Sequence, residues 1–175
     1  VPLTLTERQA IIDAYTRRLE DRVVTAIGRA LADMRPARLR FGRAEAGFAR
    51  NRRVAITPNG PVDHDVPVLA VEDAAGRLRA VVFGYACHNT TLPGTVCEFN
   101  GDYAGFAQIE LERRYPGAKA LFVTGCGADA NPHPRGELKQ ARQYGAELAA
   151  AATRALGGKP RDLAGPLRAA YELAR

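Results

Sequence analysis

Two apolar, β-favouring runs each end abruptly in a polar loop, and this repeated pattern limits the possible folds more than any other feature. The first run, Val81–Ala86, leads into a histidine, an amide and two hydroxyl side chains at 88–91. The second, at 120–123, leads into a glycine-rich segment at 124–136. In an open α/β sheet, ligand-binding and catalytic groups collect just beyond the carboxyl ends of strands. If the two strand ends are neighbours, their loops form one site.

The sequence also contains segments with helical periodicity, as an α/β fold requires. Apolar residues recur every three or four positions over 12–34, which predicts a long amphipathic helix, with Thr6 as N-cap and Gln9 at N3 of a capping box. A second helix is expected after Asp102. A third is expected over 136–156, because this segment is rich in alanine and is followed by a glycine pair.

Strands are expected at 39–47, 48–57, 66–71, 78–86 and 119–124, with turns at glycine and proline between them. The fold class is therefore α/β, a mixed sheet covered by helices. The 175 residues, 46% of them hydrophobic, predict a single domain over 1–175. Because the chain starts without methionine, we expect an excised part of a larger domain, with 159–175 leading into a further segment.

Composition narrows the classes of function. The chain contains no serine, so it cannot itself supply a serine nucleophile. Its three cysteines form no CxxC pair, which excludes a zinc-finger pattern and gives no disulfide framework. No apolar run reaches the ~18–20 residues that span a bilayer. The net charge of +6 comes from scattered arginines, so nucleic-acid binding is not expected, and peripheral contact with anionic lipid head groups is the partner that a basic surface favours.

Among the three histidines, His88 is the leading candidate for chemistry because it lies at a strand end. It can be a metal ligand, a general base or an anion-binding group, or a structural histidine bonded to the backbone. His64 is expected at the surface, and His133 is expected to shape its loop. No HxxxH, HxH or HExxH spacing occurs. Strand alternation places Cys87 on the face opposite His88, in the core.

Four other side chains have both a functional and a structural interpretation. Cys126, between two glycines, is either a thiolate nucleophile activated by His88 or, as we favour, a small buried residue in a tight turn. Asp102 opens a helix, where an N-cap role would account for it. Asp129 can orient a histidine or brace its own turn. Arg52 can clamp a carboxylate or an oxyanion, or lie at the surface.

In order along the chain, these segments resemble the neutral/alkaline (non-lysosomal) ceramidase family, in the middle of its catalytic N-terminal domain. The matching segments are Asn51-Arg52, Val66–Val71, Phe83–Thr91, Gly101-Asp102 and Gly125–Pro132. Family members are zinc-dependent amidases that hydrolyse the N-acyl bond of ceramide to sphingosine and a fatty acid. The resemblance implies a lipid amide substrate and a secreted or periplasmic location, whereas three cysteines without a pairing pattern argue against an oxidising compartment.

The resemblance also implies roles for individual residues. His88 matches a zinc-ligand histidine of the family, and Arg52 matches the arginine of its Asn-Arg motif. The family's Gly-Asp-Val-Ser-Pro-Asn loop corresponds to 127–132, where the serine position falls on Ala130 or Asn131 and the hydroxyl is lost. The other zinc ligands of the family have no identifiable match. The resulting candidates are Arg52 and Asn131 as catalytic residues, Asn51, Asp102 and Gly127 as substrate-binding residues, and His88 as metal ligand.

The leading hypothesis is a zinc-dependent hydrolase of N-acyl amide bonds, in which water attacks a metal-polarised carbonyl and Arg52 with the Gly125–Gly127 backbone stabilises the oxyanion. Without the serine, the substrate need not be ceramide, and the isolated chain is expected to be inactive. Two alternatives stay open. One is a catalytically inactive α/β binding domain that keeps the family's groove for a lipid or glycan, and the other is a hydrolase with Cys126 as nucleophile.

Overall fold

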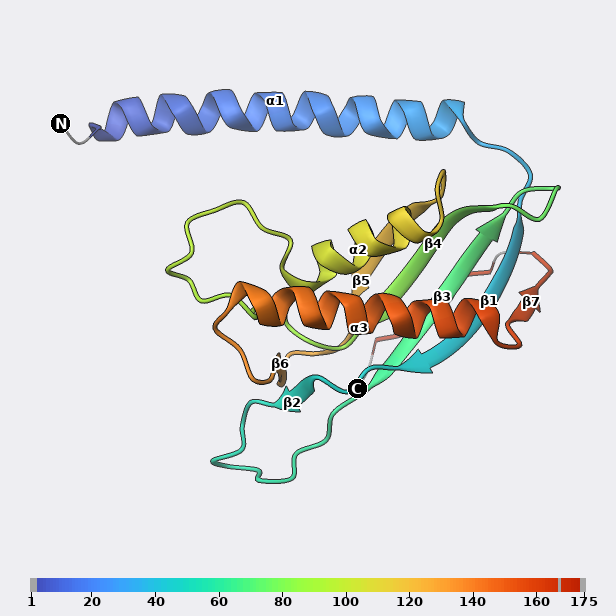
Figure 1. Ribbon diagram of the computed structural model, residues 1–175. Coiled ribbons are helices and arrows are strands. Elements are labelled where there is room, and N and C mark those ends of the chain that lie inside the picture. Colours follow the sequence, from blue (N-terminus) through green and yellow to red (C-terminus); the bar gives the residue numbers. More distant parts are fainter. Residues whose placement is uncertain (1–2, 167, 174–175) are drawn as a thin grey trace. The chain divides into compact units, whose positions relative to one another are not determined.

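The computed structural model describes residues 3–166 and 168–173, which divide into two compact units. The first unit, up to Pro36, holds the helix α1 (Leu5–Ala32). The second unit starts at Ala37 and holds every strand of the described residues, together with helices α2 (Asp102–Arg114) and α3 (Leu138–Gly157) (Figure 1). Within the described residues, no helix is both long enough and apolar enough to span a bilayer.

Helix α1 begins two residues earlier than predicted. Thr4 is the N-cap: its hydroxyl accepts from the Glu7 amide at 3.3 Å, and the Glu7 carboxylate accepts from the Thr4 amide at 2.8 Å. The prediction of Thr6 as N-cap with Gln9 at N3 was wrong. The Glu7 carboxylate makes a charge-assisted hydrogen bond at the positive end of the helix dipole, which a glutamine amide cannot match.

The second unit is built on a five-stranded mixed sheet in the order β5-β4-β3-β1-β7. Strands β1 (Arg38–Glu45), β3 (Asp65–Glu72) and β4 (Leu78–Tyr85) are antiparallel neighbours. Strand β5 (Lys119–Thr124) runs parallel to β4, so β4, α2 and β5 form a βαβ unit. This architecture confirms the predicted α/β class and the mixed sheet.

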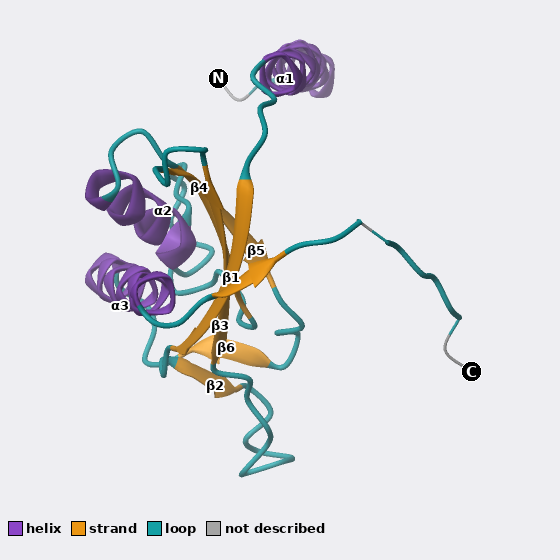
Figure 2. Cartoon of the chain, turned by 90° about the vertical axis from the view of Figure 1, so that its right-hand side faces the viewer, coloured by secondary structure: helices purple, strands orange, loops and turns teal. Residues whose placement is uncertain are grey.

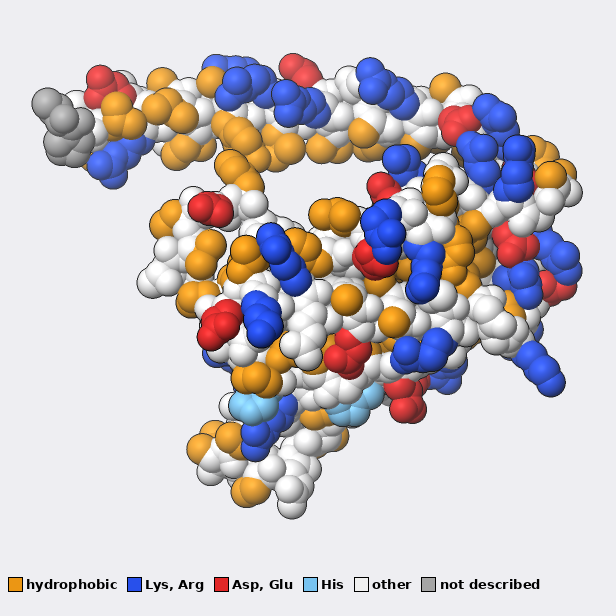
Figure 3. All heavy atoms as spheres, viewed as in Figure 1, with side chains coloured by type: hydrophobic (Ala, Val, Ile, Leu, Met, Phe, Trp, Pro, Cys, Tyr) orange, Lys and Arg blue, Asp and Glu red, His pale blue; other side chains and the backbone are white. Residues whose placement is uncertain are grey.

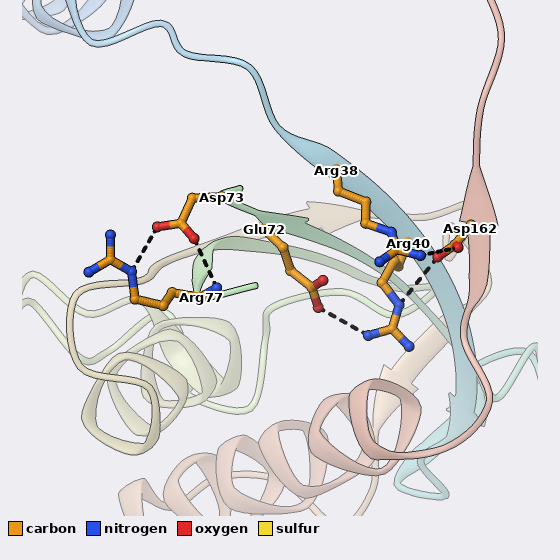
Figure 4. Close-up of polar contacts among 6 residues, drawn as sticks. All are labelled: Arg38, Arg40, Glu72, Asp73, Arg77 and Asp162. Carbon is orange, nitrogen blue, oxygen red and sulfur yellow. Dashed lines mark hydrogen bonds and ion pairs between the residues drawn. The ribbon is translucent and has the colours of Figure 1, made fainter. Parts of the chain in front are cut away.

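The sequence pattern does not predict the edge strand β7 (Arg161–Leu163), which pairs antiparallel with β1. Its Asp162 forms ion pairs with Arg38 and Arg40, and the Arg40 guanidinium also contacts the Glu72 carboxylate at 3.1 Å (Figure 4). Arg40 thus connects β7 to β3 across β1. A three-residue strand is too short to show the period-two alternation that identifies strands in a sequence.

A second, two-stranded sheet pairs β2 (Ala49–Asn51) with β6 (Ala130–Pro132). The predicted strand at 48–57 was too long, because the chain turns after Asn51. The Asn51 side-chain oxygen accepts from the Arg53 amide at 2.9 Å, two residues on. Asparagine side chains often form this local bond in competition with the strand ladder, and it ends β2 here.

Helices α2 and α3 cover one face of the five-stranded sheet (Figure 2). Val81, Phe83 and Tyr85 alternate toward this face and are fully buried. The helices approach closely at Gly145, where an added Cβ would lie 2.5 Å from the Phe106 Cβ. Four stacked or tilted rings, from Phe48, Tyr85, Tyr103 and Tyr144, fill the core near β2. This packing places β2 and β6 beside the carboxyl end of β4.

Candidate functional site

The carboxyl ends of β4 and β5 lie side by side, which fulfils the condition for a shared site. Tyr85 and Thr124 are partners at the end of the parallel ladder, and the Gly125 amide donates to the Tyr85 carbonyl at 3.0 Å. The loops at 86–91 and 125–131 therefore leave the sheet at adjacent points.

Gly127 allows the second loop to cross directly over the first. A Cβ at this position would lie 2.3 Å from both the Ala86 carbonyl carbon and the Cys87 nitrogen, closer than real contacts allow. The Gly127 amide donates to the Gly125 carbonyl, and the Gly125 amide to Tyr85. Both glycine amides are therefore engaged within the fold, which removes them as the oxyanion donors that the sequence suggested.

His88 is held at the crossing by the start of β6. Its backbone amide and its ring Nδ1 both hydrogen bond to the Ala130 carbonyl oxygen, each at 3.0 Å. A carbonyl oxygen only accepts, so Nδ1 donates in this bond, and Nε2 is the ring nitrogen left for another partner. Metal-binding histidines are commonly oriented by such a backbone bond. His88, which is half-buried, therefore fits the part of a metal ligand through Nε2.

Within residues 3–166 and 168–173, no three His, Cys, Asp or Glu side chains lie close enough together to hold a metal. His64 and His133 are engaged by other partners: the His64 Nδ1 bonds the Ala46 carbonyl at 3.0 Å and lies 3.4 Å from the Tyr85 hydroxyl, and the His133 Nε2 bonds Arg50 at 3.1 Å. Among the described residues, His88 is the oriented histidine that lies where the loops after β4 and β5 meet.

Asn51 and Arg52 are tied to the second loop from the side of β2. The Arg52 amide donates to the Asp129 carbonyl at 2.7 Å, and its Nε donates to the Ala128 carbonyl at 3.0 Å. The buried Asn51 amide donates to the Asp129 carboxylate at 3.2 Å and to the Pro61 carbonyl at 3.1 Å. The structure therefore brings the Asn-Arg pair to the loop that follows β5, and Asp129 braces that junction.

Asn131 lies on β6 beside the loop that follows β4. Its side-chain oxygen accepts from the Thr90 hydroxyl at 3.5 Å, the longest of these bonds. Arg135 donates to the same hydroxyl at 3.3 Å. Next to Thr90, the Thr91 hydroxyl is buried and has no hydrogen-bond partner among the described residues. Thr90 thus connects the loop after β4 to Asn131 and Arg135.

Asp102 begins α2 but is not its N-cap, because Gly101 occupies that position. The prediction of an N-cap was wrong. The Asp102 backbone is left-handed, with φ of 50°, and its buried carboxylate accepts from the amides of Leu92 at 3.0 Å and of Tyr103 at 2.7 Å. Asp102 thus fastens the loop after β4 to the start of α2.

Two cysteines near the loop junction differ in their burial. Cys87 is buried as predicted, and this burial raises the pKa of its thiol to about 12. Cys126 is exposed, so the favoured interpretation of a small buried residue was wrong. It occupies the middle of a turn closed by Gly127 and Gly125, at the end of the edge strand β5, where one side is open to solvent.

The sequence pattern gives no sign of two further arginines at this site. Arg50 lies opposite Asn131 in the β2–β6 ladder, and Arg135 follows β6. Figure 3 shows Lys or Arg side chains beside histidine over the region of β2 and β6. A lone arginine in a loop resembles any surface arginine in a sequence, and only the fold shows which ones converge.

The sequence matches no known family profile and no curated protein. Two solved structures are similar in fold. The neutral ceramidase from Pseudomonas aeruginosa aligns with a TM-score of 0.74 and 24% identity over 83% of this chain. A ceramidase complexed with C2 aligns with a TM-score of 0.72 and 23% identity over 79% of it. The chain spans only 26% and 25% of these proteins. The fold of this chain is therefore similar to that of a segment that makes up about one quarter of each ceramidase chain.

Proposed function

We propose that this protein hydrolyses N-acyl amide bonds at the junction of the loops that follow β4 and β5. The observation that carries the proposal is the fixed orientation of His88, whose Nδ1 donates to Ala130 and whose Nε2 is presented for a ligand. The fold shared with ceramidases supports the choice of amide chemistry. In this proposal His88 is one zinc ligand, and the remaining ligands come from outside the described residues.

In the proposed reaction, water adds to the amide carbonyl carbon and the C–N bond breaks. The acid product keeps the hydroxyl group, and the amine product takes the proton. Zinc, when bound, supplies polarisation of the carbonyl and activation of the attacking water. His88 contributes an oriented imidazole, because its Nδ1 donates to the Ala130 carbonyl.

Arg52 is the proposed donor to the developing oxyanion. Its Nε is held by the Ala128 carbonyl, which fixes the guanidinium while its Nη hydrogens stay available. Asn131 is the proposed donor to the substrate amide, because its oxygen already accepts from Thr90 and its amide hydrogens remain. Asn51, Asp102 and Gly127 act in this proposal by positioning the loops that border the substrate.

The test is hydrolysis by the complete protein loaded with zinc. A panel of amides with one acyl chain and different amines, assayed in water labelled with heavy oxygen, should give labelled acid and free amine. Arg52→Gln should lower kcat by about 100-fold, the usual effect of losing one oxyanion donor. Arg53→Gln is the matched control, because the neighbouring side chain is exposed and should leave kcat unchanged.

Failure to hydrolyse any member of the panel, with the zinc-loaded protein folded, overturns the proposal. If the same protein still binds acyl chains or glycans, the site is that of an α/β binding domain. If turnover occurs without metal and is abolished by Cys126→Ala, a thiol mechanism replaces the one proposed here.

A further inference from the structure

Three arginines line one small pocket between β2, β6 and the loop that follows β6. The pocket has a volume of about 240 Å³, and its charged lining residues are Arg50, Arg52 and Arg135. Asn51 and Asn131 also line it, and none of its lining residues is an aspartate or glutamate. We propose that this pocket binds an anionic group of the substrate, so that the preferred amide carries a carboxylate or a phosphate on its amine part.

The three guanidinium groups retain their charge and most of their donors. Among the ion pairs of the described residues, none involves Arg50, Arg52 or Arg135. Each group is held instead by a neutral acceptor: the His133 Nε2 for Arg50, the Ala128 carbonyl for Arg52, and the Thr90 hydroxyl for Arg135. Because a guanidinium only donates, the His133 Nε2 accepts in this bond.

The acidic group nearest to this junction does not neutralise the pocket. The Asp129 carboxylate accepts from the Asn51 amide, and no ion pair among the described residues joins it to an arginine. Three like charges that face one pocket repel each other, and an anion bound between them removes this repulsion. Arginine pairs with carboxylate and phosphate through parallel hydrogen bonds, which gives such a pocket its selectivity.

The pocket adjoins the proposed hydrolytic site through β6. Asn131 lines the pocket, and the residue before it, Ala130, holds the His88 ring. Arg50 lies directly opposite Asn131 in the β2–β6 ladder. An anion seated on Arg50 and Arg135 thus places the rest of the substrate beside His88. The identity of the scissile bond in this inference rests on the proposed function. The preference for an anion follows from the pocket alone.

Binding to the complete protein tests the inference without turnover. Calorimetry compares three probes with the same dodecanoyl chain: N-dodecanoylglycine, N-dodecanoyl-O-phosphoethanolamine and the neutral N-dodecanoylethanolamine. At least one anionic probe should bind about tenfold or more tightly than the neutral one, as charge-assisted hydrogen bonds imply. The better of the two identifies the anion as a carboxylate or a phosphate.

The variant Arg50→Gln/Arg135→Gln should remove this preference and leave the affinity for the neutral probe unchanged. Arg161→Gln, which removes the same charge from an exposed position on β7, should keep the preference. Equal affinity for all three probes, or a preference that survives in the double variant, overturns the inference. Tight anion binding without hydrolysis of either anionic probe contradicts the proposed function and leaves the anion pocket established.

Discussion

His88 and Ala130 are joined twice, because the backbone amide and the ring Nδ1 of His88 both reach the Ala130 carbonyl oxygen at 3.0 Å. The loop after β4 is thereby fixed to β6, and the orientation of the imidazole is set by the fold. Each element of the proposed site depends on this junction. Changes to the crossing of the two loops should therefore affect stability and the site together.

Gly127→Ala should destabilise the protein, because its Cβ would lie 2.3 Å from backbone atoms of Ala86 and Cys87 that cannot move aside. We expect a loss of about 1–3 kcal/mol in the free energy of unfolding, the range typical of overpacking. Denaturant unfolding followed by circular dichroism measures it. Gly105→Ala is the control: it lies within α2 with open space at the Cβ, so the same substitution should be neutral or stabilising.

Asn51→Ala should loosen β2 from the loop after β5. The buried Asn51 side chain donates to Asp129 and Pro61 and accepts from Arg53, and its removal leaves these groups without partners. We expect a cost of about 1–3 kcal/mol in the free energy of unfolding. Asn59→Ala, at an exposed position in the following turn, should change it by less than about 0.5 kcal/mol. Equal effects of the two substitutions would contradict the bracing role of Asn51.

The polar ends of the strands could be predicted from the sequence, because an apolar run that stops at His88 or at Gly125 is a local pattern. The adjacency of β4 and β5 was only a condition at the level of the sequence, and the structure meets it through the βαβ arrangement around α2. The contacts of Asn51 and Arg52 with Asp129 did not follow, because they join segments far apart in the sequence through strands of only three residues.

Two errors of the sequence analysis have different physical origins. Thr4 and Thr6 both begin a capping-box pattern. The carboxylate of Glu7 bonds the Thr4 amide and makes Thr4 the N-cap. Cys126 sits in the tight turn that the glycines predicted, yet the turn ends an edge strand and leaves the thiol exposed. Neither the choice of N-cap nor the exposure of Cys126 can be predicted from composition or periodicity.

Thiol reactivity should separate the three cysteines. Only a thiolate reacts, and burial raises the pKa of Cys87 to about 12, so this thiol stays protonated as the pH rises through the range around 8.5 where ordinary thiols ionise. The exposed Cys97 and Cys126 should react in the native protein at neutral to mildly alkaline pH, and Cys87 only after unfolding. Mass spectrometry after alkylation, with and without denaturant, measures this. Modification of Cys87 in the native protein at a rate similar to Cys126 would show that the core around β4 is open.

The most direct test of the central claim is zinc content and zinc affinity, measured on the complete protein and on its His88→Ala variant. His64→Ala is the matched control, because His64 also bonds a backbone carbonyl through Nδ1 but lies away from the loop junction. Zinc ligation by His88 predicts stoichiometric zinc in the wild type and in His64→Ala, and its loss in a folded His88→Ala. A wild type that binds no zinc, or zinc retained at full affinity without His88, would contradict it.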